Sequence, residues 1–324
     1  MKIYAVKHKN DGIRCESRSG GVFTALSDVI LSNKGVIYGC VLDKNLEVIH
    51  IRAETEEDRN RMRGSKYVQS KLGDTFKHIK NDLIDGRLVL FSGTSCQVAG
   101  LKSFLGKNYE RLLCIDIVCY GVPSAKLLES YLQWQMKRNR KKITWVDFRN
   151  KKDFGWSDHV ESLYTETGDK INSRVYTQLF CGLNGMRPSC YKCLWKSINH
   201  PGDITIGDYW GIDKAVPEFN DNKGVSLVFV NSEKGTKFFE QIEEDIIWKQ
   251  TRIEKCMLQK PLVEPYEEPE SRERFWKDFN NKDFEYIARK YTNYGIINKI
   301  KNKLSNLKYR IREKILICAD DNNE

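Results

Sequence analysis

The sequence predicts an α/β fold: a largely parallel layered sheet, an antiparallel β-rich C-terminal subdomain and a helical basic tail. Three observations lead to this prediction. Strand-like and helix-like segments alternate up to about residue 142, and strand-like segments joined by a turn signal follow. Residues 288–315 then carry apolar side chains at helical spacings among lysines and arginines. Alternation of this kind is typical of a sheet whose parallel strands are joined by helices.

The alternating part begins with a strand at 2–6 and a helix at 20–31, in which Val22, Leu26 and Ile30 recur at helical spacing. Thr55, followed three residues later by Asp58, marks the start of another helix. Further strands are expected at 35–43, 47–53, 66–70, 87–93 and 111–121, and further helices at 72–86, 94–106 and 124–138.

A second subdomain is expected to begin near residue 143. Strands at 142–151, 159–166 and 170–177 read as antiparallel, because Thr167-Gly168-Asp169 is a hairpin turn signal. We also assign to this subdomain a loop at 186–203, strands at 203–211 and 224–232, and a helix at 234–245.

The composition is that of a globular protein, with 40% hydrophobic and 30% charged residues and a net charge of +10. Its longest apolar runs, such as residues 36–42 and 225–230, fall far short of the roughly 18 residues that a membrane span requires. The N-terminus returns to lysine after four apolar residues, unlike a secretory signal. We therefore expect a cytoplasmic protein.

The tail from Ala288 to Ile315 holds nine lysines or arginines against the single Glu313. The ordinary interpretation is a surface helix whose apolar stripe packs on the body of the protein, and we favour it. The alternative is peripheral contact with an anionic membrane surface or a partner. Nucleic-acid binding is not expected, because no recognised module or base-stacking pattern accompanies the positive charge.

Four of the ten cysteines stand in positions suited to metal binding. Cys190 and Cys193 form a C-x-x-C in a polar loop, and Cys96 and Cys119 each follow a predicted strand. Carboxyl ends of neighbouring parallel strands meet at one sheet edge, where ligands bind. Four thiolates could build a 4Fe-4S cluster or a tetrahedral zinc site, with His200 as a further zinc ligand, and a redox dithiol is a third interpretation.

Two segments of small polar residues precede predicted helices and could cradle phosphate oxygens of a dinucleotide such as FAD. They are residues 17–21, with Ser17, Ser19, Gly20 and Gly21, and residues 92–97, with Gly93, Thr94 and Gln97. Neither matches G-x-G-x-x-G, so an NAD fingerprint is not supported. Asp208 and Trp210 end a strand and could border a flavin or substrate. No hydrolase signature is present, and no catalytic residue is assigned.

Six segments in order resemble the coenzyme F420 hydrogenase/dehydrogenase beta subunit family over roughly residues 1–235. They are SRSGGVFTAL, RGSKYVQS, LFSGTSCQVAGLKSFLG, DIVCYGVPS, RPSCYKCLWK and GDITIGDYWG. The chain is most similar to bacterial members from cell-surface polysaccharide gene clusters. The resemblance implies an iron-sulfur flavoprotein with FAD and a 4Fe-4S cluster, acting on a small molecule such as a saccharide or its precursor.

The resemblance also implies roles for individual residues. The implied cluster ligands are Cys96, Cys119, Cys190 and Cys193. The implied flavin contacts are Ser17, Ser19, Gly20, Gly21, Ser65, Lys66, Tyr67, Gly93, Thr94, Gln97, Asp208 and Trp210. This chain departs from the family pattern at Ser95, where proline is usual, at Tyr120, where histidine is usual, and around His200-Pro201, where arginine is frequent.

On this basis we divide the chain into an N-terminal α/β region at 1–85, a flavin and iron-sulfur region at 86–235, and a helical C-terminal extension at 236–324. Because the chain lacks the cysteine run of a bacterial ferredoxin module, electrons are expected from a ferredoxin-like donor. The alternatives are a zinc-stabilised accessory protein that docks partners in polysaccharide assembly, without redox activity, and a sugar transferase.

Overall fold

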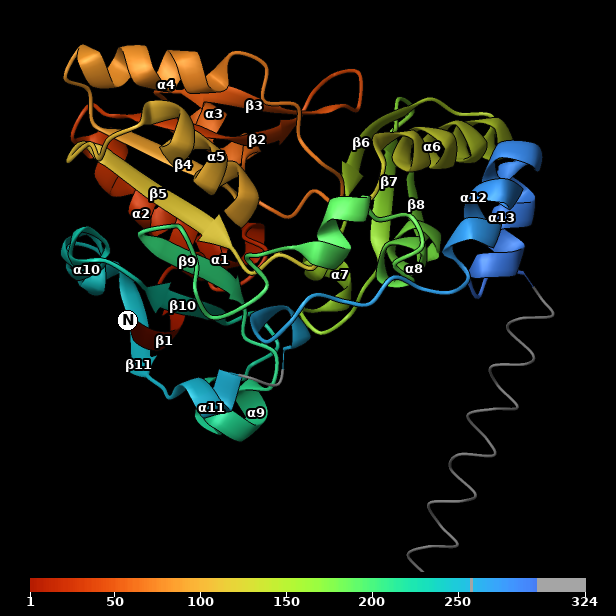
Figure 1. Ribbon diagram of the computed structural model, residues 1–324. Helices are drawn as coiled ribbons and strands as arrows, with labels where there is room; N and C mark the ends of the chain where they lie inside the picture. Colours follow the sequence, from red (N-terminus) through yellow and green to blue (C-terminus); the bar gives the residue numbers. More distant parts are fainter. Residues whose placement is uncertain (257–258, 296–324) are drawn as a thin grey trace, which may run out of the picture.

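The computed structural model describes residues 1–256 and 259–295, and its largest element is an eight-stranded sheet (Figure 1). The strand order is β11-β1-β10-β9-β5-β4-β2-β3. The strands are β1 (Lys2–His8), β2 (Val36–Leu42), β3 (Val48–Ala53), β4 (Val89–Thr94), β5 (Leu112–Ile117), β9 (Ile204–Asp208), β10 (Ser226–Val230) and β11 (Ile246–Gln250).

The predicted parallel sheet forms the centre of this large sheet. Strands β2, β4, β5 and β9 pair in parallel, whereas β3 on one side and β10, β1 and β11 on the other pair antiparallel. Helices cover both faces, as the α/β prediction requires. The carboxyl ends of β4, β5 and β9 therefore lie side by side at one edge.

The longer helices pack against both faces of the large sheet. Helices α2 (Val22–Ser32) and α10 (Glu233–Glu240) share a core cluster with the inward side chains of β1, β2 and β10. Helices α4 (Thr75–Ile84) and α5 (Ser95–Leu105) share another with β2, β4 and β5. Shorter helices are α1 (Asp11–Glu16), α3 (Glu56–Arg61), α7 (Lys151–Phe154), α9 (Ile212–Ala215) and α11 (Ile253–Cys256). Short 3-10 helices lie at Pro188–Lys192, Pro217–Phe219, Glu243–Asp245 and Lys260–Leu262.

A separate three-stranded antiparallel sheet has the order β6-β7-β8, formed by β6 (Ile143–Asp147), β7 (Glu161–Thr165) and β8 (Lys170–Ser173). It begins where the second subdomain was predicted, and Gly168 makes the expected β7–β8 turn with φ +82°. Four helices pack against it: α6 (Ala125–Asn139), α8 (Val175–Cys181), α12 (Arg272–Asn281) and α13 (Phe284–Tyr291). Figure 1 shows this helix-covered sheet beside the large one.

The structure confirms one expected helix start and places two expected strands in a different sheet. The expected helix start at Thr55 is confirmed, because the Thr55 side chain accepts a hydrogen bond from the backbone N–H of Asp58 (3.2 Å). The strands expected at 203–211 and 224–232 are present as β9 and β10, but they join the large sheet instead of the second subdomain. All five residues of β10 are buried, which is the pattern of a strand covered on both faces.

The strand expected at 66–70 is wrong. This segment is an irregular loop, and the adjoining Lys71 makes one isolated bridge to Ile49. The Lys66 ammonium donates hydrogen bonds to the backbone carbonyls of Met62 and Arg63 at 2.8 and 2.9 Å, which folds the loop back on itself.

The predicted tail is described only as far as residue 295. Its first residues complete α13, where Ala288 is buried in the core of the small sheet. The apolar positions from Ile296 to Ile315 lie outside the described residues. Within the described residues, no helix is long and apolar enough to cross a membrane.

The buried carboxylate of Glu161 fixes α8 against the small sheet. Glu161 is fully buried and accepts hydrogen bonds from the Tyr131 hydroxyl (3.1 Å), the Tyr176 backbone N–H (2.9 Å) and the Thr177 hydroxyl (2.6 Å). Glu161→Ala would leave these donors buried without an acceptor. We expect the free energy of unfolding to fall by about 3 kcal/mol.

Chemical denaturation of the purified variant checks this expectation. Glu110→Ala, which removes an exposed carboxylate, is the control and should change the free energy by less than about 0.5 kcal/mol. Equal stability of the two variants would contradict the anchoring role of Glu161.

Candidate functional site

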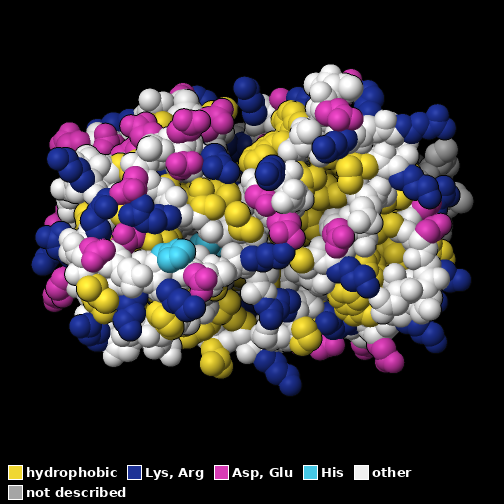
Figure 2. Space-filling model, turned by 90° about the horizontal axis from the view of Figure 1, so that it is seen from above, with side chains coloured by type: hydrophobic (Ala, Val, Ile, Leu, Met, Phe, Trp, Pro, Cys, Tyr) yellow, Lys and Arg dark blue, Asp and Glu magenta, His cyan; other side chains and the backbone are white. Residues whose placement is uncertain are grey.

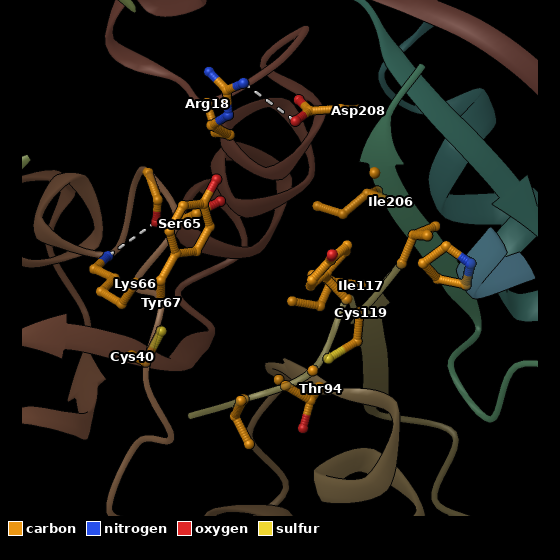
Figure 3. Close-up of a pocket in the computed structure, with 18 of the residues that line it drawn as sticks. Arg18, Cys40, Ser65, Lys66, Tyr67, Thr94, Ile117, Cys119, Ile206 and Asp208 are labelled. Carbon is orange, nitrogen blue, oxygen red and sulfur yellow. Dashed lines mark hydrogen bonds and ion pairs between the residues drawn. The ribbon is translucent and has the colours of Figure 1, made fainter. Parts of the chain in front are cut away.

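A cavity of about 630 Å³ opens between the carboxyl edge of the large sheet and the segment that carries the small sheet. The ends of β4, β5 and β9 contribute Thr94, Ile117 and Asp208 to its wall. Helices α2 and α5 begin there, and the loop at 62–70 closes one side. Figure 3 shows Arg18 and Asp208 at one end of this view, Cys119 and Thr94 at the other, and Tyr67 between them.

Most of the sequence-predicted residues line this single cavity. They are Ser17, Ser19, Gly21, Ser65, Lys66, Tyr67, Gly93, Thr94, Gln97, Asp208 and Trp210, together with Cys96, Cys119 and Cys190. Gly20 and Cys193 are not among the lining residues. Residues from six separate sequence segments thus meet in one place.

Gly20 is required for close packing. A β-carbon at Gly20 would stand 2.2 Å from the Val6 carbonyl oxygen and 2.7 Å from the Ser226 backbone nitrogen. Gly20 also donates its N–H to the Ser226 hydroxyl at 2.9 Å. The neighbouring Gly21 caps α2 with φ +93°, a left-handed conformation that favours glycine. The two glycines hold the 17–21 loop against β1 and β10.

The serines of this loop do not offer their protons to the cavity. Ser17 donates its hydroxyl to the Ile13 carbonyl (2.7 Å), and Ser19 donates to the Val225 carbonyl (2.6 Å). A hydroxyl has a single proton, so neither can donate to a phosphate in this arrangement. Arg18 lies between the two serines and has unused hydrogen-bond donors. Its Nε and Nη1 atoms are buried and have no hydrogen-bond partner.

Asp208 binds two arginines and a tryptophan. Its Oδ2 lies 3.3 Å from Arg18 Nη2 and 3.6 Å from Arg149 Nη1, and its Oδ1 accepts a hydrogen bond from Trp156 Nε1 at 3.0 Å. Arg149 also donates to the Tyr67 hydroxyl at 3.4 Å. Asp208 therefore organises the basic end of the cavity, where it is the one carboxylate among the lining residues.

Trp210 borders the cavity, but its ring faces are largely covered. Trp156 stacks on it at 4.9 Å between ring centroids, and His159 stacks at 5.7 Å. Burial, followed by the charges of Arg149 and Arg18, lowers the pKa of His159 to about 4, so this imidazole is neutral near pH 7. A flat ligand can meet the edge of Trp210 more easily than its face.

Aromatic side chains form another wall. Tyr67 stacks on Phe180 at 4.3 Å, and Tyr120 packs on Phe180 at 5.1 Å and on Tyr266 at 4.6 Å. All four line the cavity. Such rings provide stacking surfaces for a planar ligand.

The residues at the start of α5 cap their own helix. Gln97 Oε1 accepts a hydrogen bond from the Thr94 backbone N–H at 3.0 Å, as in a capping box, and its Nε2 donates to the Ser70 hydroxyl at 2.9 Å. The Thr94 hydroxyl lies 3.1 Å from Cys96 Sγ. Thr94 and Gln97 thus hold Cys96 at the helix N-terminus.

The four predicted cysteine ligands influence one another electrostatically. Burial raises the pKa of Cys119 to about 12, and Cys190 and Cys96 add to the rise. Burial also raises the pKa of Cys193, again with contributions from Cys96 and Cys190. Among the described residues, however, no three His, Cys, Asp or Glu side chains are grouped closely enough to hold a metal ion. The thiols are neighbours without forming a closed metal site.

Cations outnumber anions along the cavity wall. Arg18, Arg63, Lys66, Arg149, Arg187 and Lys260 line it together with Asp208. Lys66 donates to the backbone of its own loop, and burial lowers its pKa. On the face seen in Figure 2, lysine and arginine side chains are spread widely. The local excess of positive charge in the cavity favours an anionic ligand.

Comparison with known proteins gives a family and a fold. The family described as the C terminus of the coenzyme F420 hydrogenase/dehydrogenase beta subunit matches residues 86–255, which is more than half of the chain. The chain belongs to this family. No curated protein matches it.

Among solved structures, a chain of the F420-reducing NiFe hydrogenase complex from Methanosarcina barkeri, determined after xenon derivatization, is similar in fold. The TM-score is 0.52 at 18% sequence identity, and the match covers 77% of this chain and 81% of that chain. The α/β prediction and the family resemblance are both confirmed.

Two departures from the F420 hydrogenase beta subunit pattern contact each other. Ser95 Oγ lies 3.2 Å from His200 Nδ1, which also lies 3.0 Å from Asp116 Oδ2. Serine and carboxylate share the same ring nitrogen, so the group lacks the geometry of a hydrolytic triad. His200 is absent from the cavity wall, and the zinc role considered for it gains no support.

The third departure, Tyr120, lies among the aromatic side chains of the wall. Its hydroxyl donates to the Cys181 carbonyl at 3.0 Å. Burial raises the pKa of this hydroxyl well above its usual value, so Tyr120 stays protonated and neutral. The histidine usual in the family would be titratable near neutral pH.

Several residues at the cavity were not predicted from the sequence. Arg18 lies between the predicted contacts Ser17 and Ser19, and its place inside the SRSGG motif could have indicated a role at the cavity. Arg149 and Phe180 carry no local signal, because tertiary packing alone brings the small sheet to the cavity. Lys196 lies beside the thiols: its ammonium donates to the Tyr120 carbonyl at 2.9 Å. Burial lowers its pKa, while Cys119, Cys190 and Cys193 act in the opposite direction.

Gly20→Ala should destabilise the protein by about 1–3 kcal/mol, because the new methyl group meets backbone atoms that cannot move independently. Gly100→Ala is the matched control. It lies within α5, and the nearest atom to its new β-carbon is 3.6 Å away. We expect it to stabilise the helix by about 0.5–1 kcal/mol. Thermal unfolding of both variants tests the packing role, which a tolerated Gly20→Ala would refute.

Proposed function

We propose that this chain is an iron-sulfur flavoprotein oxidoreductase of the cytoplasm. A ferredoxin-like protein would supply electrons, which pass through a 4Fe-4S cluster to FAD and a small-molecule substrate. We further propose a role in cell-surface polysaccharide biosynthesis, with regions 1–85, 86–235 and 236–324 as N-terminal, cofactor-bearing and C-terminal parts. Support comes from family membership together with one observation: a single cavity joins thiols, aromatic walls and cationic side chains.

The residues present fit a flavin dinucleotide. Gly21 and Thr94 place the N-termini of α2 and α5 at the wall, where backbone N–H groups and helix dipoles favour phosphate. Tyr67 and Phe180 offer apolar ring surface.

Four cysteines are the ligand set that a 4Fe-4S cluster uses, although the described side chains are not grouped closely enough in this arrangement to hold a metal ion. Cys96, Cys119 and Cys190 line the cavity, and Cys193 interacts electrostatically with two of them. Ligation requires thiolates, and the positive charge of the metal would overcome the burial that keeps Cys119 protonated. The buried Lys196 ammonium would further favour the anionic forms. The proposed ligands remain Cys96, Cys119, Cys190 and Cys193.

When bound, the cluster and FAD would supply single-electron and hydride chemistry. The chain's own residues would hold them. Thr94 and Gln97 orient Cys96 through the cap of α5, and the stacked Tyr67 and Phe180 exclude water from one wall. Asp208 keeps Arg18 and Arg149 at the opposite end of the cavity from the thiols.

An electron-donating partner would dock near the C-x-x-C loop. Leu194 follows Cys193 directly and is 84% exposed, more than any other large hydrophobic residue in the described part of the chain. Lys192 and Arg187 on the same loop are also exposed. An apolar side chain with cations nearby suits a small acidic carrier, since complementary charge speeds the encounter.

Anaerobic purification followed by absorption spectroscopy and assay of iron, sulfide, zinc and flavin tests the proposed cofactors. We expect flavin bands with a broad iron-sulfur shoulder. Cys190→Ser should lose most of the iron and the shoulder while keeping flavin, because it removes one thiolate ligand. Cys15→Ser, an exposed cysteine outside the cavity wall, is the control and should keep both. A colourless protein with stoichiometric zinc would refute the redox proposal.

Leu194→Asp should slow reduction of the protein by reduced ferredoxin about tenfold at low salt, because it replaces an apolar contact with a charge that repels an acidic carrier. Stopped-flow absorbance measures this rate. Reduction by dithionite should be unchanged, and Ile84→Asp, an exposed position on α4, is the control variant. Equal ferredoxin rates in all three proteins would exclude docking at Leu194.

A further inference from the structure

Arg18 carries more hydrogen-bond donors than the protein satisfies. Its Nη2 donates to the Trp156 carbonyl at 3.2 Å and lies 3.3 Å from Asp208 Oδ2. The side chain is only 11% exposed. Its Nε and Nη1 atoms, which bear three N–H groups, are buried and have no hydrogen-bond partner. Leaving such donors buried and unmatched is unfavourable unless a ligand completes them.

The charge around Arg18 is also incompletely balanced. Arg18 and Arg149 share Asp208, so the three side chains together carry one positive charge. Asp208 is the one carboxylate among the residues that line the cavity. The adjacent His159 cannot supply a compensating negative charge. A cationic group of this kind, partly removed from water, attracts an oxyanion more strongly than an exposed arginine does.

The Arg18 side chain contacts groups other than those proposed to bind the flavin phosphates. The backbone N–H groups suited to a dinucleotide lie at the starts of α2 and α5, on the large sheet. Arg18 instead contacts Asp208 at the end of β9 and the Trp156 carbonyl, and Asp208 also binds Arg149 from the segment around the small sheet. Figure 3 shows Arg18 and Asp208 at the end of the view away from Cys119.

We propose that Arg18, supported by Arg149 and Asp208, binds the carboxylate or phosphate group of the substrate, which makes the substrate a small anionic molecule. This inference rests on the proposed function for the redox role of the cavity. The unused Nε and Nη1 atoms lie on different edges of the guanidinium, so each can donate a single hydrogen bond to an oxygen of the anion, while Nη2 stays on Trp156 and Asp208. Asp208 holds the guanidinium in place, and Arg149 adds positive charge. The anionic group would lie at the Arg18 end, with the rest of the molecule directed toward Tyr67.

Inorganic phosphate and acetate serve as probes, with acetamide as the uncharged comparison. Each is titrated into the purified protein with its bound cofactors, at constant ionic strength, while tryptophan fluorescence is recorded, because Trp156 and Trp210 adjoin the site. Flavin per chain is measured on the same samples. We expect saturable binding of the two anions and none of acetamide.

Three variants make the test specific. Arg18→Gln should weaken phosphate binding at least tenfold without changing flavin per chain, and Arg18→Lys should give an intermediate affinity, since it keeps the charge but loses the fixed planar donors of the guanidinium. Arg63→Gln is the matched control: it removes another cation from the same cavity wall, and its effect should stay below about threefold.

Asp208→Asn tests the positioning role of Asp208. If the asparagine oxygen accepts from Trp156, its amide N–H groups face Arg18 and Arg149, so Arg18 loses the carboxylate that holds it and phosphate should bind at least threefold more weakly. Unchanged or tighter binding in this variant would contradict the proposal, even if Arg18→Gln failed to fold.

The outcomes also separate this inference from the proposed function. If Arg18→Gln loses flavin while phosphate affinity stays constant, Arg18 holds the flavin phosphate and the substrate assignment is wrong, although the redox proposal stands. If phosphate binds equally to all variants, or without saturation, there is no anion subsite at Arg18. If wild-type protein binds neither flavin nor cluster, the redox proposal fails, and the phosphate titration still decides whether Arg18 forms an anion site.

Discussion

The geometry of the cavity depends on the carboxylate of Asp208. This one side chain, at the carboxyl end of β9, connects Arg18 from the loop before α2 with Arg149 and Trp156 from the segment around the small sheet. Three parts of the chain that are distant in sequence are thereby held around a shared space. The ion pairs are partly shielded from water, so they are stronger than pairs on an open surface, and removing one partner leaves the others buried and uncompensated. The arrangement therefore both shapes the cavity and makes it electropositive.

The cavity has two chemically different ends. At one end are thiols, the buried ammonium of Lys196 and the exposed loop that carries Leu194, so this end combines the proposed cluster ligands with the proposed docking surface. At the other end are Arg18 and Arg149, covered by the stacked Trp156 and Trp210. Tyr67 and Phe180 form a wall that belongs to neither end alone. Such a division suits a protein that accepts electrons on one side and holds a small molecule on the other, with the parallel strand ends as a rigid base.

Local sequence signals were reliable where a short segment determines its own structure. Thr55 starts a helix and Gly168 turns a hairpin, because each needs only neighbouring backbone to act. The signals were less reliable where partners are distant. The segment at 66–70 has strand-like residues but folds back so that the Lys66 ammonium donates to backbone carbonyls. Strand β10 joins the large sheet, although the small sheet precedes it in the sequence. The sequence places Gly20 among the phosphate contacts, although its backbone approaches β1 and β10 too closely to admit a side chain.

Periodicity is enough to predict the α/β class, and motifs at strand ends predict that several segments meet at one edge, since parallel strands bring their carboxyl ends together. The family is indicated by the resemblance of six motifs in order. Packing between distant segments sets which atoms of those segments are available. Ser17 and Ser19 give their protons to carbonyls, Trp210 is covered on its faces, and Arg18 alone in its loop keeps unused donors. Several of these contacts join segments that are distant in sequence, as Val225 is from Ser19 and Trp156 is from both Arg18 and Trp210, and no local pattern encodes them.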